Sequence, residues 1–61
     1  MKSNELLRIL KRDGWYIIRQ NGSHMIMRHS LKKRQITVPN HGSNEIGKGL
    51  EKRIKKDAGL L

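Results

Sequence analysis

The stretch from Trp15 to His29, WYIIRQNGSHMIMRH, decides the fold of this chain. Two short runs rich in apolar residues, Trp15–Arg19 and Ser23–His29, lie on either side of the dipeptide Asn21-Gly22. β-Branched and aromatic residues favour strands, and Asn-Gly is the strongest short-range signal for a two-residue hairpin turn, because both central residues of such a turn need a positive φ. The stretch therefore predicts two antiparallel strands.

The register of this hairpin determines which side chains share a face. A turn centred on the Asn-Gly dipeptide pairs Gln20 with Ser23 and Arg19 with His24, so that Arg19 and His24 project from the same face. A bulge in either strand would change this pairing. Apolar residues occupy positions of both parities in the two runs, so the pattern leaves open which face is buried.

The segments on either side of the hairpin predict a helix, a third strand and a second helix. Apolar residues recur at helical spacing between Ser3, a suitable N-cap, and Gly14, a suitable left-handed C-cap, which predicts a helix over about residues 3–12. Residues 35–38, QITV, alternate as a strand does before Pro39. Further on, apolar residues fall four apart and predict a second helix that ends at Gly59: Ile46, Leu50, Ile54 and Ala58.

The predicted order is αβββα, an α+β fold in which two helices pack on one face of a three-stranded antiparallel sheet. A chain of 61 residues has room for one domain, residues 1–61, and buries only about 60% of its unfolded surface. It contains no Cys, which excludes a disulfide framework and a Cys-based zinc site and fits a reducing cytoplasm. Charge interrupts every apolar run, so neither a signal peptide nor a membrane span is predicted.

The charge of the chain points to a polyanionic partner. Fourteen Lys and Arg against five Asp and Glu give a net charge of +9. Nucleic acid fits best, because each phosphate that Lys or Arg neutralises releases a counterion. A membrane surface fits less well, since neither predicted helix combines its basic residues with a broad apolar face. An acidic protein could use the same charges, and only Trp15 and Tyr16 are available for stacking on bases.

Few side chains can carry chemistry. The chain has no Gly-rich phosphate loop, no Cys nucleophile and no HExxH motif, and its carboxylates are scattered, so we expect neither a metal site nor a cofactor. Three histidines remain as candidates for proton transfer near neutral pH. His24 follows the predicted turn, where Gly22 allows a substrate to approach and Ser23 offers a hydroxyl and an amide. His29 and His41 are more simply interpreted as packed or surface side chains.

Three runs together resemble the HicA family of toxin ribonucleases: GWYIIRQNGSHMIMRH, VPNHG and GKGLEKRIKKDAGL. The resemblance covers nearly the whole chain, and the order and spacing of the motifs make it specific. Two positions depart from the family pattern, because Met25 stands where the family often has His, and Leu50 stands where it often has Thr. The matching positions are Gly14, Trp15, Arg19, Gly22, Ser23, His24, Pro39, His41 and Gly59.

The resemblance implies a fold similar to the double-stranded RNA-binding domain, in agreement with the order predicted from the residues. It implies the toxin of a type II toxin-antitoxin system, a metal-independent endoribonuclease that cleaves mRNA in the cytoplasm with His24 as general acid or base. It also implies a HicB-like antitoxin that binds the toxin and masks its site. We expect a monomer when the toxin is free, a hetero-oligomer with the antitoxin, and no membrane partner.

RNA carries its own nucleophile, the 2′-hydroxyl, so cleavage needs a base, an acid and a cation near the phosphate. His24 is the expected base, and the residues do not identify a second proton carrier, for which His41 and water are the candidates. The alternative is a non-catalytic RNA-binding module of the same fold. A DNA-binding regulator lacks a helix-turn-helix pattern here. The other expected substrate contacts are Gly22, Ser23, Arg19 and Arg28 near the cut, and Lys32, Lys33, Lys48 and Lys52 along the RNA backbone.

Overall fold

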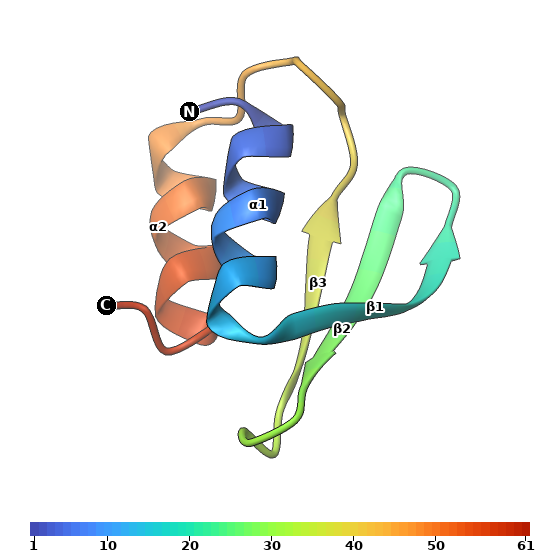
Figure 1. The fold of residues 1–61 in the computed structure, drawn as a ribbon. Coiled ribbons are helices and arrows are strands. Elements are labelled where there is room, and N and C mark those ends of the chain that lie inside the picture. The colour runs from blue at the N-terminus through green and yellow to red at the C-terminus, as the bar shows by residue number, and fades with distance from the viewer.

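The computed structural model describes all 61 residues as a three-stranded antiparallel sheet with two helices against one of its faces (Figure 1). The predicted αβββα order is confirmed. Neighbouring strands in the sheet are also neighbours in the chain, and β2 lies in the middle. Neither helix has the length and apolar content needed to cross a bilayer. The elements are α1 (Ser3–Asp13), β1 (Trp15–Asn21), β2 (His24–His29), β3 (Gln35–Pro39) and α2 (Lys48–Asp57).

The hairpin turn lies one residue later than the sequence predicted. Asn21 is the last residue of β1 and pairs with His24, so the turn consists of Gly22 and Ser23. Gly22 has φ +60°, and no residue other than glycine has a positive φ. A positive φ at the first turn position alone is the pattern of a type II′ turn, which favours Gly there. The Asn-Gly signal thus located the hairpin correctly but assigned the wrong pair of residues to its turn.

The predicted pairing of Arg19 with His24 is wrong, because Arg19 pairs with Ile26. β1 contains a bulge just before Arg19: Ile17 pairs with Met27, and the register shifts between Ile17 and Arg19. Arg19 is nevertheless on the same face as His24, since its actual partner lies two residues beyond the predicted one and side chains alternate with a period of two.

The middle strand separates the two faces of the sheet. Met25, Met27 and His29 of β2 are buried towards the helices, whereas His24 and Arg28 are exposed on the other face, which we call the open face. Apolar side chains from both helices and all three strands fill the space between sheet and helices, so the molecule has one core. The buried core residues are Leu6, Leu10, Trp15, Met25, Met27, Ile36, Val38, Ile46, Ile54 and Ala58.

Two details of the helices differ from the prediction. Ser3 is not the N-cap of α1; Lys2 takes that position, and the buried Ser3 hydroxyl donates to the carbonyl oxygen of Pro39 at 2.7 Å. Helix α2 starts only at Lys48, so Ile46 packs in the core from the preceding loop, and Leu50 is 43% exposed. The N-terminus of α1 is therefore tied to the end of β3.

Candidate functional site

His24 lies at the start of β2, next to the hairpin turn, on the open face. Its side chain is exposed, and its strand neighbours are Asn21 in β1 and Pro39 in β3. No side-chain hydrogen bond or ion pair within the protein involves its imidazole. Both ring nitrogens are thus available to a substrate that crosses this end of the sheet.

The turn beside His24 is fastened to the loop that follows β3. The backbone N–H of Asn40 donates to the carbonyl oxygen of Ser23 at 2.6 Å. A side chain at Gly22 would meet no protein atom within 4 Å, so the space around this glycine is open, and its positive φ is what favours glycine there. The turn therefore has a fixed backbone and an unobstructed outer surface.

The two arginines predicted beside His24 lie at different distances from it. Arg19 is opposite Ile26, which makes it the diagonal neighbour of His24, within reach of a long side chain. Arg28 is opposite Tyr16 in β1 and is four residues from His24, or about 13 Å along the strand. The structure thus brings Arg19 to His24 and places Arg28 at the far end of the open face.

His41 lies in the loop after β3. It is two residues beyond Pro39, the partner of His24, which limits its Cα to within about 13 Å of the His24 Cα. Its backbone N–H donates to the Ser3 hydroxyl at 3.3 Å, while its side chain is exposed. The loop is held in place at this residue, and the imidazole is open to solvent.

His29 is a packed structural residue, as the sequence indicated. Its ring contacts Trp15 edge-on, with centroids 5.3 Å apart. Its Nδ1 accepts the backbone N–H of Leu31 at 3.0 Å, and its Nε2 lies 2.7 Å from the carbonyl oxygen of Asp13, so a neutral ring with the proton on Nε2 satisfies both contacts. Both nitrogens are used, and the ring is unavailable for proton transfer to a substrate.

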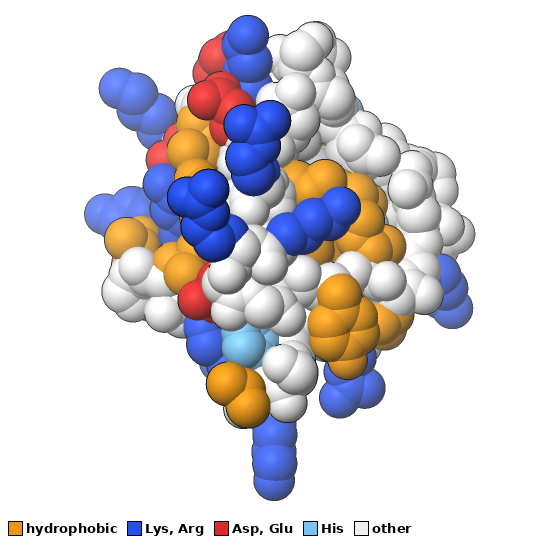
Figure 2. All heavy atoms as spheres, in the orientation of Figure 1, with side chains coloured by type: hydrophobic (Ala, Val, Ile, Leu, Met, Phe, Trp, Pro, Cys, Tyr) orange, Lys and Arg blue, Asp and Glu red, His pale blue; other side chains and the backbone are white.

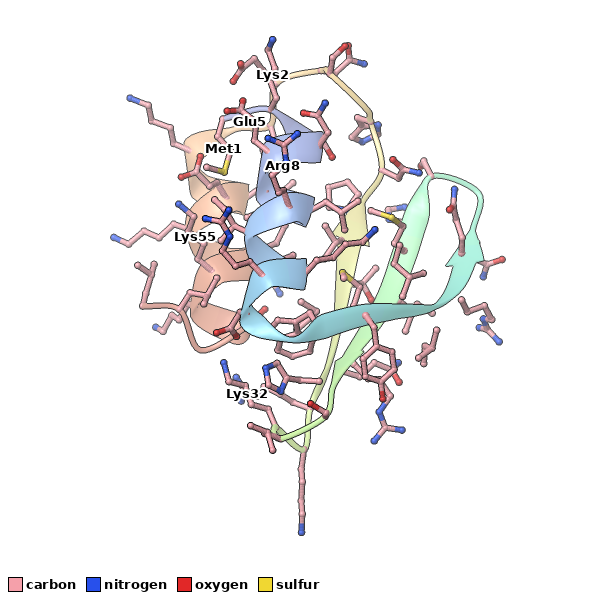
Figure 3. All side chains as sticks on the ribbon, viewed as in Figure 1. Met1, Lys2, Glu5, Arg8, Lys32 and Lys55 are labelled. Atoms are coloured by element: carbon pink, nitrogen blue, oxygen red, sulfur yellow. The ribbon has the colours of Figure 1, made fainter.

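The lysines expected to contact RNA fall into two groups. Lys32, labelled in Figure 3, is half-buried. Its ammonium donates to a carboxylate oxygen of Asp13 and to the carbonyl oxygen of Ala58, each at 2.8 Å. The hydrogen bond from Lys32 holds the pKa of Asp13 below its usual value. Lys32 is thus engaged within the fold, whereas three other lysines are exposed and form no ion pair: Lys33, Lys48 and Lys52.

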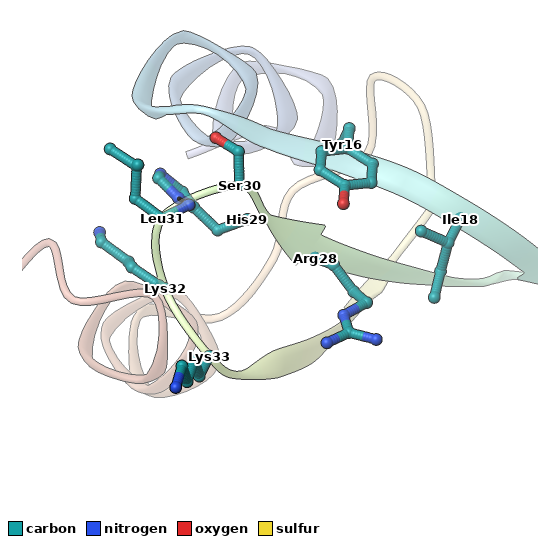
Figure 4. A pocket seen from close by; sticks show the side chains of 8 residues that line it. All are labelled: Tyr16, Ile18, Arg28, His29, Ser30, Leu31, Lys32 and Lys33. Atoms are coloured by element: carbon teal, nitrogen blue, oxygen red, sulfur yellow. Dashed lines mark hydrogen bonds between the residues drawn. The ribbon is translucent and has the colours of Figure 1, made fainter.

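Sequence reasoning missed the apolar part of the open face. Tyr16 and Ile18 of β1 are each 48% exposed. Together with Arg28 and Lys33 they line a groove of about 510 Å³ at the end of the open face away from His24 (Figure 4). The alternation within β2 was the signal that could have located it: once His24 is outward, Ile26 and Arg28 must be outward as well.

A metal-binding cluster is not formed anywhere in the chain. No three side chains of His, Cys, Asp or Glu come close enough together to hold an ion.

The model of the HicA toxin family of bacterial toxin-antitoxin systems matches residues 3–60. The chain belongs to the HicA toxin family. It is also similar to a probable mRNA interferase HicA of Pseudomonas fluorescens (strain Pf0-1), with 40% identity over 60 residues, 98% of this chain and 97% of the relative. In this HicA-family toxin, His24, Arg19 and the Gly22-Ser23 turn form the candidate site on the open face.

Proposed function

We propose that this HicA-family toxin is an endoribonuclease that cleaves mRNA without a metal ion, with His24 as general acid or base. The observation that carries the proposal is the exposed His24 imidazole, which lies on the open face of a +9 chain with Arg19 as its neighbour. The mRNA interferase name of the similar Pseudomonas protein supports the reaction type. Because the substrate is mRNA, the site of action is the cytoplasm.

The reaction starts when His24 takes the proton of a ribose 2′-hydroxyl. The 2′-oxygen then attacks the adjacent phosphorus, the bond from phosphorus to the 5′-oxygen breaks, and that oxygen must receive a proton to leave as a hydroxyl. The products are a 2′,3′-cyclic phosphate and a 5′-hydroxyl end. General acid or base catalysis by one side chain typically contributes a factor of about 10² to 10⁴ to the rate.

The neighbours of His24 supply the remaining requirements. The Arg19 guanidinium, diagonal to His24, stabilises the extra negative charge on the phosphorane-like transition state. His41 or a water molecule supplies the proton for the leaving oxygen. The open turn at Gly22 and Ser23 lets the RNA backbone approach, and the exposed Lys33 contacts a more distant phosphate. Lys48 and Lys52 belong to α2, on the other side of the sheet from His24, and contact phosphates of RNA that continues around the edge of the molecule.

A HicB-like antitoxin is proposed as the inhibitor. The toxin is a monomer when free and forms a hetero-oligomer with the antitoxin, which covers His24 and contacts the surrounding cations with carboxylates. Charge complementarity of this kind speeds the capture of the toxin.

The test of the proposal replaces His24 with Ala. We expect cleavage to fall at least about 100-fold while RNA binding and folding persist, because truncation of an exposed side chain typically changes stability by no more than about 0.5 kcal/mol. The matched substrate carries 2′-deoxyribose at the cut site, which removes the nucleophile and keeps the phosphates. The original protein should bind this modified RNA and leave it uncut. EDTA should not slow the cleavage of ordinary RNA by the original protein.

Two results would contradict the proposal. If His24→Ala cleaves RNA at nearly the original rate in a preparation free of contaminating nucleases, His24 is not the catalytic residue. If neither the original protein nor His24→Ala cleaves RNA although both proteins bind it, the chain is a non-catalytic RNA-binding module.

A further inference from the structure

The groove at the far end of the open face is built from three separate segments of the chain. Tyr16 and Ile18 come from β1, Arg28 from β2, and Lys33 from the connection to β3, and Figure 4 shows these side chains around one opening. Tyr16 and Arg28 are direct cross-strand partners, which fixes their separation. The groove has about 510 Å³ of space and is open to solvent.

The chemistry of the groove fits an anion that carries a flat apolar group. No carboxylate lines it, and Asp13 forms its ion pair with Lys32 and with neither Arg28 nor Lys33. The charges of Arg28 and Lys33 are therefore uncompensated. The exposed ring of Tyr16 and the side chain of Ile18 add an apolar surface on the same opening. A nucleotide combines these two properties, since it joins a planar base to a phosphate.

The groove and His24 lie on one face of one strand. Arg28 and His24 both project outward from β2, and the distance between their positions is about 13 Å. A stacked strand advances about 3.4 Å for each nucleotide, so this distance corresponds to about four stacked nucleotides or to fewer extended ones. A single RNA strand that lies along β2 reaches both places.

We propose that this groove binds an unpaired nucleotide of the RNA strand that flanks the cleavage site, with its base stacked on Tyr16 and its phosphate held by Arg28 and Lys33. This inference rests on the proposed ribonuclease function and names its substrate class, since a base inside a duplex is stacked between its neighbours, whereas a base of a single strand can stack on a side chain. Aromatic side chains on exposed sheet faces bind single-stranded RNA in this way in other folds. Trp15, the other candidate for stacking, is buried and takes no part.

The experiment compares a long and a short RNA. A single-stranded RNA of about ten nucleotides reaches from His24 to the groove, whereas a dinucleotide that spans only the cut does not. We expect Tyr16→Ala to raise KM for the long RNA about five- to tenfold, with kcat unchanged and with dinucleotide cleavage unchanged. Tyr16→Phe keeps the ring and should behave as the original protein does.

The cationic half of the groove is tested separately. Arg28→Gln and Lys33→Gln should each weaken binding of the long RNA, measured with the non-cleaving His24→Ala protein, more than Lys11→Gln does. Lys11 provides the matched control because its loss removes the same charge from α1, away from the groove. These two variants also test the site if Tyr16→Ala fails a thermal-unfolding check of its fold.

The proposal is overturned if the Tyr16, Arg28 and Lys33 variants bind and cleave the long RNA as the original protein does. It is equally overturned if the variants weaken only the binding of the antitoxin, because the groove would then be a protein-docking surface. In both cases cleavage that still depends on His24 would leave the proposed function standing. If His24→Ala cleaves normally, the proposed mechanism fails, while affinities measured with RNA that carries 2′-deoxyribose at the cut site still report on the groove.

Discussion

At the scale of single residues, Gly14 shows how one position meets two demands. The sequence identified it as the C-cap of the first helix, and its φ of +117° agrees with that role. The structure adds a second demand, because a Cβ atom at Gly14 would lie 2.6 Å from Nε2 of His29. That ring is held by hydrogen bonds at both nitrogens and cannot move aside without breaking them. No local pattern reveals this contact, since it joins residues 15 positions apart in the sequence.

We therefore expect Gly14→Ala to lower the free energy of unfolding by at least about 2 kcal/mol, as backbone strain and the contact with His29 act together. Gly42→Ala is the matched control, because Gly42 has φ +60° and open space where its Cβ would be. Its strain alone should cost about 1 kcal/mol. Urea unfolding of both variants provides the measurement, and equal losses would show that His29 does not restrict position 14.

At the scale of the elements, the local sequence pattern was sufficient to predict a helix or strand wherever contacts between neighbouring residues determine it. The predicted helix over residues 3–12 and the predicted strand over residues 35–38 agree with the observed elements to within about a residue at each end. The hairpin turn was predicted one residue too early, which shifted the partner of Arg19 by two residues, because the Asn-Gly signal concerns φ at two positions and the observed turn needs a positive φ only at Gly22. The bulge near Ile18 lies in a run without glycine, so nothing in the residues marked it.

The candidate site was predictable in part, because the alternation of side chains along a strand is a local property. His24 and Arg19 share a face in either register, so this part of the site survived the error in the turn. The separation of Arg28 from His24 follows from their spacing of four residues within β2, about 13 Å, and so was available from the sequence once both were assigned to one strand. Ser3 was misassigned as a cap because its hydroxyl bonds to Pro39, 36 residues away. Long-range contacts of this kind come from packing and leave no local signal.

Lys32 joins the ends of the two helices, and its replacement tests how much that connection stabilises the fold. Its ammonium joins Asp13 at the end of α1 to the carbonyl oxygen of Ala58 at the end of α2. Since the folded pKa of Asp13 lies below its ordinary value of 3.8, the ion pair stabilises the fold fully above about pH 5. That contribution is lost as the pH falls through the lowered pKa, where the carboxylate takes up a proton.

We therefore expect Lys32→Gln to unfold at a lower urea concentration than the original protein at pH 7, and the difference to shrink at about pH 2 to 3. A smaller difference should remain at low pH, because the hydrogen bond to Ala58 does not depend on the charge of Asp13. Lys33→Gln is the control, as the neighbouring Lys33 forms no ion pair. A difference that is the same at both pH values would mean that the pair with Asp13 contributes nothing measurable.

At the scale of the whole molecule, positive charge is spread over the surface and is largely uncompensated. Only Lys32 and Lys55 among the 14 Lys and Arg form ion pairs. Figure 2 shows Lys and Arg side chains around most of the outline and above α1, where Figure 3 places Arg8, with few carboxylates between them. The carboxylate of Glu51 is bonded to Lys55, which holds its pKa below the usual value, so it remains charged and occupied.

A chain with this charge distribution should bind RNA with a strong dependence on salt. Five cations are proposed to contact phosphates: Arg19, Arg28, Lys33, Lys48 and Lys52. Each neutralised phosphate on a single strand contributes about −0.7 to the slope of log K against log salt concentration, so five contacts predict a slope of about −3.5. Affinity should then fall about 100-fold between 50 and 200 mM salt.

The His24→Ala protein allows this salt dependence to be measured without cleavage of the RNA. Lys48→Gln and Lys52→Gln, each made in that protein, should bring the slope closer to zero by about 0.7. Lys11→Gln, the control, should leave the slope unchanged. A slope near zero in the His24→Ala protein would show that stacking on Tyr16 dominates binding and that the lysines of α2 do not contact the RNA backbone.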